Sequence, residues 1–467
     1  MKRLSLDTIK SFRNQFDKDS NNGLLVAKNA MTNSKAKDVI INQDVVNKLD
    51  SFFSNEINLE TTITNQENSG RCWIFSFLNI INFDMISKYD LESDFELSYS
   101  YLFFWDQLEK ANYFLNNVLK FKDEEVTSRM NNYLFYHGIC DGGHFHMIKN
   151  LINKYGLVPK SSMNENMQAN NTSQLNALLN TTIKSFGYQL REGKNSSNQK
   201  LIEKMMYYIY SILVVFLGSP PDKVKWHYYK KSDDSKKSKK IKSKSGVTHK
   251  IYRTKVIMTP IEFFKKVVKF PINDYILIGN YPHPSKPFYQ LYTINYLNNM
   301  MGDENLLKFV NLPIKDLKIS SQKSLTNNQI VWFCGDISKE SNHSLGILDK
   351  NVMDYSNIFD LDFIKMDKGN RMIYKNAEIS HAMVFRGFHS EKKNDIPEKW
   401  LVENSWGESI GKKGRYVMSN EWFEDNVFCI AINKKFLDSK VIKIYKTSLN
   451  KSKKLDPWDI FGYPAIL

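Results

Sequence analysis

One cysteine in the stretch NQENSGRCWIFSF, residues 65–77, is placed to act as a nucleophile. Cys72 follows the turn cluster Asn68-Ser69-Gly70 and begins an apolar run that predicts a buried helix. A cysteine attacks as its thiolate, and a helix N-terminus or a nearby imidazolium lowers the thiol pKa from its usual value of about 8.5. The alternative interpretation is a packing cysteine in a buried helix, so the choice depends on residues elsewhere in the chain.

A base for that thiol is best supplied by His381 among the nine histidines. His381 begins HAMVFRGF, a predicted strand, and Asn404 lies on the next predicted strand in WLVENSWG. The Asn404 amide oxygen can accept from one ring nitrogen while the other nitrogen faces sulfur, and Trp406 can shield that bond from water. A lone histidine is more often structural, but the set Cys72, His381 and Asn404 indicates nucleophilic catalysis.

Acyl transfer also requires donors for the negative charge that develops on the carbonyl oxygen. Gln66 lies six residues before Cys72, and its side-chain amide could donate together with the Cys72 backbone N–H. The alternative for Gln66 is an ordinary polar loop residue.

Hydrophobic periodicity predicts which elements position these groups. Ile9, Phe12 and Phe16 recur at helical spacing, and helical patterns return from Cys72, over 95–140, after the Gly142-Gly143 turn and over 172–218. After about residue 325 the chain changes to short β-branched and aromatic segments bounded by Gly, Asn and Asp, which predict antiparallel strands. Helices first and strands later predict an α+β fold.

Composition and charge narrow the class of protein. The 467 residues, 42% of them hydrophobic, predict a globular protein with more than one unit. Four scattered cysteines without a CxxC pair, no signal-peptide core and no apolar run of membrane-spanning length favour a soluble, reduced, cytoplasmic protein with no membrane contact.

The excess positive charge is local. Residues 223–255 hold 13 Lys and Arg against two Asp, which leaves about +4 of the net +15 for the rest of the chain. Within them the low-complexity Lys/Ser stretch 231–246 predicts a solvated or disordered loop. A second hypothesis is that this basic segment binds nucleic acid, although lysines without interleaved aromatics give only weak, salt-sensitive attraction.

Two histidines, His144 and His146, stand two residues apart after the double glycine. They could suggest a metal pair, but no cysteine or carboxylate cluster lies near them in the sequence, so a structural role is favoured. We expect neither a metal nor a cofactor.

Long motifs along nearly the whole chain resemble the bleomycin hydrolase family, also called aminopeptidase C, a cytosolic branch of the papain-like cysteine peptidases. They include TNQENSGRCWIFSFLN, DGGHFHMIKNLINKYGLVPKS, ISHAMVF and KWLVENSWGE. The 309 residues between Cys72 and His381 exceed the spacing in papain itself and match the branch with a large insertion.

The resemblance implies a papain-like fold, with a helical subdomain, an antiparallel β subdomain, a large helical insertion and two terminal arms. The implied parts are an N-terminal helical arm (1–60), a helical subdomain with the nucleophile helix (61–170), a helical insertion carrying the 231–246 loop (171–325), a β subdomain (326–450) and a C-terminal arm in the cleft (451–467).

The resemblance also implies a thiol aminopeptidase that acts on peptides with a free N-terminus and on amino-acid-like amides such as bleomycin. Its site residues would be Cys72 as nucleophile, His381 as general acid and base, Asn404 as the residue that orients the ring, and Gln66 as oxyanion donor. Asp141, Gly142 and Gly143 would line the substrate cleft, and the Leu467 carboxylate would receive the substrate's amino group. The family assembles as a homohexamer. The chain departs from the usual family ending because Tyr463 and Pro464 follow Gly462.

Overall fold

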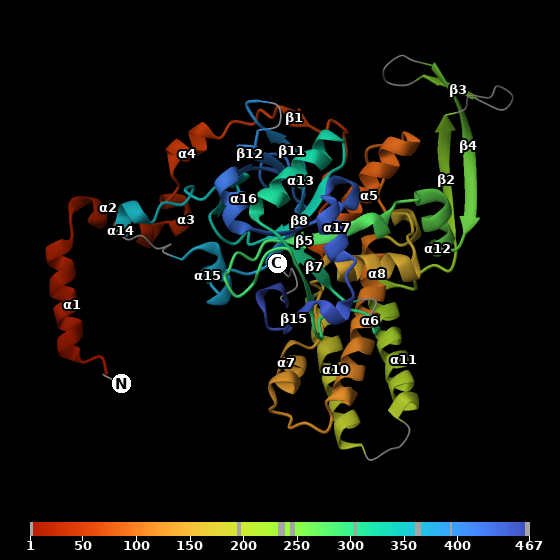
Figure 1. Ribbon diagram of the computed structural model, residues 1–467, viewed down its shortest axis with the longest axis horizontal. Helices are drawn as coiled ribbons and strands as arrows, with labels where there is room; N and C mark the ends of the chain where they lie inside the picture. The colour runs from red at the N-terminus through yellow and green to blue at the C-terminus, as the bar shows by residue number, and fades with distance from the viewer. Residues whose placement is uncertain are drawn as a thin grey trace.

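The computed structural model describes residues 3–193, 198–231, 239–242, 248–302, 306–359, 366–392 and 395–462. Figure 1 shows a central body built on a large sheet, with a helical bundle projecting from one end, a β-hairpin projecting from another corner and an N-terminal helix standing away from the body. No helix in the described ranges is long and apolar enough to cross a membrane.

The helical part of the body is built around α5 (Cys72–Tyr89), which is buried along most of its length. This follows from a sequence that is apolar nearly all round, CWIFSFLNIINF. α6 (Tyr99–Lys120) starts at Ser98, whose side chain accepts from the Tyr101 N–H, and α8 (Phe145–Tyr155) follows the double glycine. These three helices confirm the helical predictions for this part of the chain.

The strands of the body form one sheet of twelve strands in the described residues, in the order β15-β6-β7-β5-β14-β8-β11-β12-β13-β10-β9, with β1 paired to β11. At its centre β8 (Val331–Gly335), β11 (His381–His389), β12 (Lys399–Glu403) and β13 (Arg415–Ser419) pair antiparallel. The antiparallel strands predicted after about residue 325 are therefore confirmed here, and their nearly complete burial explains their continuous apolar character.

Further helices and strands precede, connect and flank these elements. The first part of the chain contains α1 (Leu6–Asp19), α2 (Asn22–Asn33), α3 (Ala36–Val39), α4 (Gln43–Lys48), β1 (Asn55–Glu56), α7 (Arg129–His137), α9 (Met167–Asn170), α10 (Ser173–Glu192), α11 (Asn198–Leu217), β2 (Val224–Lys231), β3 (Lys239–Lys242), β4 (Thr248–Met258) and α12 (Pro260–Phe263). The second part contains β5 (Tyr275–Gly279), β6 (Gln290–Ile294), β7 (Lys308–Asn311), α13 (Ile314–Thr326), β9 (Ser341–Asn342), β10 (Ile347–Leu348), α14 (Ser356–Phe359), α15 (Lys368–Ile373), α16 (Asn420–Asn426), β14 (Val427–Asn433), α17 (Ser439–Tyr445) and β15 (Lys453–Leu455).

The region expected as a helical insertion, 171–325, is helical only in part. α10 and α11 form its helical hairpin, but β2 and β4 then pair as a projecting ribbon, and β5, β6 and β7 join the large sheet. The physical reason is visible in the segment YILIG, whose five residues are all buried, as in a strand covered on both faces, and which pairs with β14 and β7 within the sheet. Most of the 231–246 Lys/Ser segment lies outside the described residues, and Lys239–Lys242 within it form β3.

A buried arginine joins the segment after β1 to the central sheet. Arg386 on β11 donates to the carbonyl oxygens of Ile57 (3.3 Å) and Leu59 (2.7 Å), and it pairs with Glu403 on β12 at 3.3 Å. Both charged side chains of that pair are only 2% exposed. Arg415 approaches the same carboxylate at 3.8 Å from a half-exposed position.

Arg386→Met should lower the free energy of unfolding by about 3–5 kcal/mol, because it leaves Glu403 charged and buried without its closest partner. Arg415→Met should cost about 1 kcal/mol or less, since its side chain is screened by water. Urea unfolding of the two variants measures the difference. Equal losses would contradict the assigned role of Arg386.

Candidate active site

The turn before Cys72 is held by the carboxylate of Asp141. The Asp141 carboxylate accepts from the Gly70 N–H at 3.1 Å, from Asn176 Nδ2 at 2.7 Å and from the Thr172 hydroxyl. Its backbone oxygen accepts from the indole of Trp73 at 2.7 Å. Asp141 was predicted to line the substrate cleft, and the structure uses its carboxylate to fix the loop that leads into α5.

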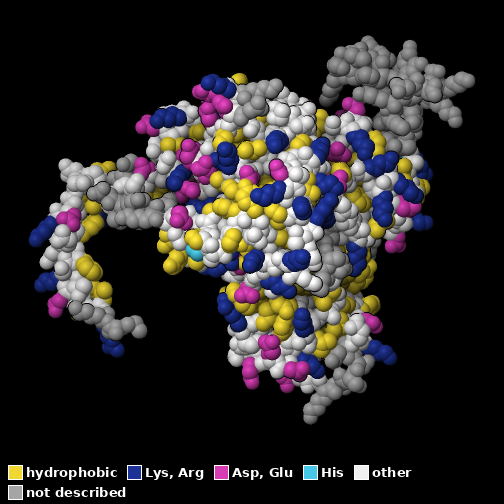
Figure 2. Space-filling view, in the orientation of Figure 1, with side chains coloured by type: hydrophobic (Ala, Val, Ile, Leu, Met, Phe, Trp, Pro, Cys, Tyr) yellow, Lys and Arg dark blue, Asp and Glu magenta, His cyan; other side chains and the backbone are white. Residues whose placement is uncertain are grey.

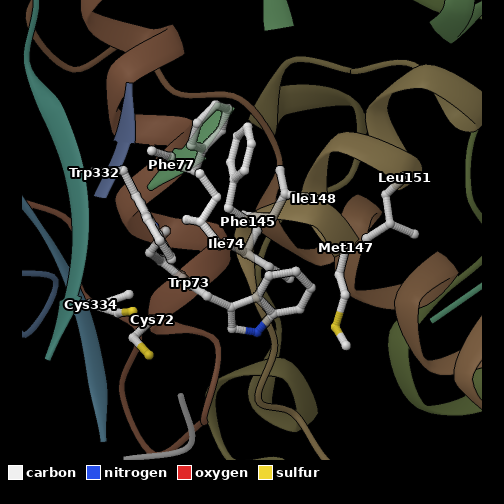
Figure 3. Close-up of a cluster of buried hydrophobic side chains, with 14 of the residues drawn as sticks. Cys72, Trp73, Ile74, Phe77, Phe145, Met147, Ile148, Leu151, Trp332 and Cys334 are labelled. Atoms are coloured by element: carbon white, nitrogen blue, oxygen red, sulfur yellow. The ribbon is translucent and has the colours of Figure 1, made fainter. Parts of the chain in front are cut away.

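Cys72 is fully buried at the first position of α5, where that helix packs against β11 and β8. The backbone N–H of Ala382, the residue after His381, and that of Trp73 act on the sulfur as hydrogen-bond donors. Figure 3 shows the Cys72 side chain beside Cys334 of β8, while the Trp73 indole points away from it toward Met147. The thiol therefore lies against the end of β11 that begins with His381.

The ring of His381 is oriented by Asn404. His381 Nε2 lies 2.8 Å from Asn404 Oδ1. The same Oδ1 accepts from the Ser405 N–H at 2.7 Å, and Asn404 Nδ2 donates to the Tyr416 hydroxyl at 3.3 Å, which fixes which end of the amide faces the ring. Because Oδ1 can only accept, Nε2 carries the proton, and in the neutral ring Nδ1 is left with a lone pair. Nδ1 is buried and has no hydrogen-bond partner among the residues that the structure describes.

Trp406 covers that hydrogen bond, with its ring centroid 4.6 Å from that of His381. The sequence predicted this shielding role from position alone. A water-excluded bond between imidazole and amide holds the ring more firmly than a solvated one.

Hydrogen bonds between residues 64–66 and residues 405–407 bring Gln66 close to His381 and Asn404. The Gln66 N–H donates to Ser405 O at 2.8 Å, and the Gly407 N–H donates to Thr64 O at 3.0 Å. The Ser405 hydroxyl donates to Gln66 Oε1 at 2.7 Å, so the amide oxygen is used and the NH2 end of Gln66 faces its own turn, where it donates to Ser69 O at 2.6 Å.

Burial disfavours charge on both central groups. Desolvation raises the pKa of the Cys72 thiol to about 12, against the lowering effect of the Ala382 and Trp73 N–H groups. Desolvation lowers the pKa of His381 to about 4, against the raising effect of the bond to Asn404. Desolvation therefore favours the neutral form of each group.

The double glycine lies against the residue next to Cys72. A Cβ on Gly143 would stand 2.5 Å from the Trp73 ring, so only glycine fits there. Lys110 of α6 supports this loop by donating to Gly142 O at 2.6 Å and to Cys140 O at 2.7 Å, while its charge is balanced by Asp106 at 2.6 Å.

A cavity of about 310 Å³ extends from this loop to the end of the described chain. Gly142, Lys110, Tyr133 and Gly462 are among its lining residues. Gly462 is brought there by Phe461, whose ring stacks on Phe309 at 4.3 Å. Residues 463–467, including the predicted carboxylate of Leu467, lie outside the described residues.

The structure thus brings Cys72, His381, Asn404 and Gln66 together, with the 141–143 loop beside them. Sequence reasoning missed two supporting residues. The sequence does point to Lys110, because it stands four residues after Asp106 as an oppositely charged pair within an apolar helical run. Ser405 has no signal beyond its place next to Asn404.

The pair His144 and His146 is used in packing. His146 Nε2 lies 3.0 Å from the Tyr445 hydroxyl, and burial lowers its pKa well below the usual value. Among the described residues there is no group of three or more His, Cys, Asp or Glu side chains placed to hold a metal.

Residues 3–462 match the peptidase C1-like family. The chain is 34% identical over 466 residues to aminopeptidase C of Lactobacillus delbrueckii subsp. lactis, covering 99% of this chain and 98% of that one. It is 33% identical to bleomycin hydrolase of Gallus gallus, with 94% of each chain covered. The crystal structure of PepW from Lactobacillus rhamnosis HN001 superposes with a TM-score of 0.88 at 33% identity, covering 99% of both chains. The papain-like α+β fold is therefore confirmed.

His381→Gln should change the pH dependence of folding stability. The wild-type ring has a pKa of about 4 in the folded protein and about 6.5 when unfolded, so the unfolded state binds the extra proton as the pH falls through that window. The wild type should therefore lose about 2 kcal/mol more than the variant between pH 7.5 and pH 5. Urea unfolding at both pH values measures this difference, and parallel losses would show that His381 is not buried as a neutral ring.

Proposed function

The chain belongs to the peptidase C1-like family and is a cysteine peptidase, and from that premise we propose that it removes N-terminal residues from peptides with Cys72 as nucleophile. The observation that supports this most strongly is the His381 ring, bound through Nε2 to Asn404 and with a bare, buried Nδ1 at the end of β11 where the thiol lies.

In the proposed first step, Nδ1 of His381 takes the thiol proton as Cys72 sulfur attacks the carbonyl carbon of the first peptide bond. The imidazolium that forms is stabilised by the Asn404 oxygen at Nε2. The charge on the substrate's carbonyl oxygen is stabilised by the Cys72 N–H at the start of α5 and by the NH2 group of Gln66.

In the next steps, His381 returns the proton to the leaving amine, so the C–N bond breaks and a thioester to Cys72 remains. The neutral ring then takes a proton from water, whose oxygen attacks the thioester carbonyl. The sulfur leaves and recovers a proton, so the free thiol and the released amino acid are formed.

The limit to N-terminal residues is proposed to come from the C-terminal arm. Support comes from β15, which pairs parallel with β6, and from Gly462, which reaches the cavity beside the 141–143 loop. From there five further residues would place the Leu467 carboxylate in the cleft to receive the substrate's amino group. Hydrolysis of amides such as bleomycin is part of the same proposal, since the relative from Gallus gallus is named for it.

Assembly as a homohexamer in the cytoplasm also belongs to the proposal. Figure 2 shows apolar side chains along α1. Its Leu6, Ile9, Phe12 and Phe16 are 84%, 41%, 59% and 44% exposed, an apolar face that a neighbouring subunit would cover. The alternative hypothesis, nucleic-acid binding by residues 223–255, gains no support from the named relatives.

Cys72→Ala should lower kcat/KM for an alanyl-coumarin amide by roughly 10³-fold or more, because the reaction loses its nucleophile. The control is Cys140→Ala, which removes another free cysteine near the 141–143 loop and should keep nearly full activity. Retained turnover in Cys72→Ala, with purity confirmed by active-site titration, would refute the proposed mechanism.

Deletion of residues 463–467 should let the enzyme cleave substrates whose N-terminus is acetylated, because the arm no longer fills the cleft. The full chain should reject them, and Leu467→Ala should reject them too, since it keeps a terminal carboxylate at the same place. Rates on matched free and acetylated fluorogenic peptides test this. Equal rejection by the full and truncated enzymes would contradict the role of the arm.

A further inference from the structure

A second, larger cavity of about 950 Å³ lies between the N-terminal arm and the β subdomain. It is bounded by Lys37 of α3, by the loop that leads into β9 and by α15. Its charged lining residues are Lys37, Lys339, Lys350, Arg371 and Glu340. The lining is therefore predominantly basic, although the charge of the whole body is nearly balanced.

This basic cavity lies next to the candidate active site. It shares Ser338 and His343 with a smaller hollow that Gln66, Ser69 and Trp406 also line. The ring of Trp406 lies 4.6 Å from that of His381 and 5.2 Å from that of His343. The His343 ring is therefore no more than about 10 Å from the His381 ring, a span of about three residues of extended peptide.

The cavity lies on the side of the leaving peptide, an inference that rests on the proposed function. Gly142 and Gly462 line one cavity, and His343 lines the basic cavity, with no lining residue in common. Trp406 lines the smaller hollow next to the basic cavity. If the amino group is held beside Gly142 and Gly462, the chain beyond the cleaved bond must continue past Trp406 toward His343.

Two of the four cations in the cavity are not neutralised within the described chain. Lys350 pairs with Asp425 at 2.8 Å, and Arg371 lies 3.9 Å from the same carboxylate. Glu340 is engaged with Asn426 Nδ2 at 2.9 Å. Neither Lys37 nor Lys339 forms an ion pair with a described residue.

Two buried nitrogen atoms on side chains of the same wall also have no hydrogen-bond partner in the described part of the chain. They are Arg371 Nε, on a side chain that is 3% exposed, and Nδ1 of the half-buried His343. Unsatisfied buried polar atoms cost free energy, and a ligand with acceptor oxygens removes that cost.

We propose that this basic cavity is a subsite for a carboxylate on the leaving part of the peptide, so that the enzyme prefers substrates with an acidic group two to four residues from the N-terminus. The acidic group is either an Asp or Glu side chain or the terminal carboxylate of a short peptide. Lys37 and Lys339 attract it, and Arg371 and His343 line the wall that it meets.

Matched peptides test the preference. In the series Ala-Ala-Ala-Ala-Ala-amide, Glu or Gln replaces the second, third or fourth residue, and Ala-Ala-Ala with a free carboxylate is compared with its amide. We expect kcat/KM to be roughly five-fold higher for the acidic member at the position that reaches the cavity. The Glu and Gln peptides test recognition of an acidic side chain, and the free and amidated Ala-Ala-Ala peptides test recognition of a terminal carboxylate.

Variants distinguish binding at this subsite from a general effect of the protein's positive charge. In the double variant Lys37→Gln/Lys339→Gln, the ratio of kcat/KM for the Glu peptide to that for the Gln peptide should fall to about one. Substitution of Lys323, an exposed lysine of α13, in Lys323→Gln should leave this ratio unchanged. Glu340→Gln should increase it, because a competing carboxylate is removed. Turnover of alanyl-coumarin amide, which has no leaving peptide, should be unchanged in all three.

The wild type with equal rates for Glu and Gln peptides, or a preference that survives the double lysine variant, would overturn the proposal. If no peptide is cleaved at all, the proposed function fails separately. Calorimetry of Ala-Ala-Glu-amide and Ala-Ala-Gln-amide with Cys72→Ala, with and without the two lysine substitutions, then decides the subsite. Tighter, lysine-dependent binding of the Glu peptide supports it, and equal binding overturns it.

Discussion

The thiol of Cys72 and the imidazole of His381 lie in one water-excluded interface between α5 and the sheet, and this shared burial governs the chemistry of the site. Desolvation raises the pKa of the thiol and lowers the pKa of the imidazole, so it favours the neutral form of each group. Burial disfavours a lone charge on either group. In the proposed mechanism, a proton that passes from sulfur to Nδ1 creates two opposite charges, and their attraction is strong where water is absent.

The rest of the structure keeps these two groups in register, although they come from opposite ends of the chain. Asp141 fixes the turn that begins α5, and Asn404 with Trp406 fixes the imidazole. The hydrogen bonds between residues 64–66 and 405–407 connect the two halves directly. These contacts are nearly all buried and mutually dependent, so we interpret the site as a rigid, preorganised one.

The elements were largely predictable from the sequence, and the supporting contacts were not. The apolar run after Cys72 and the β-branched segments around His381 and Asn404 predicted one helix and antiparallel strands, because their periodicity reflects which faces are buried. The pairing of Cys72 with His381 was inferred from the nucleophile's need for a base and from the place of His381 at the start of a predicted strand, and the resemblance to a known family agreed with it. The strands β5, β6 and β7 within the expected helical insertion were missed, since short apolar runs such as YILIG fit a buried strand or a helix equally well until a neighbouring strand is known. The role of Asp141 as a loop anchor, and the cavity that unites Lys37 with Lys339, depend on tertiary contacts between distant residues.

The measurement that tests the central claim most directly is the pH dependence of alkylation of Cys72 by iodoacetamide, followed by mass spectrometry of the peptide that contains it, in the wild type and in His381→Ala. If His381 removes the proton from sulfur, the wild-type rate should stay nearly constant between pH 5 and pH 8. The variant should react far more slowly at pH 5 and its rate should rise about ten-fold per pH unit, as expected of a thiol that must ionise without help. Superimposable profiles for the two proteins would show that the imidazole does not act on the thiol, and would contradict the account.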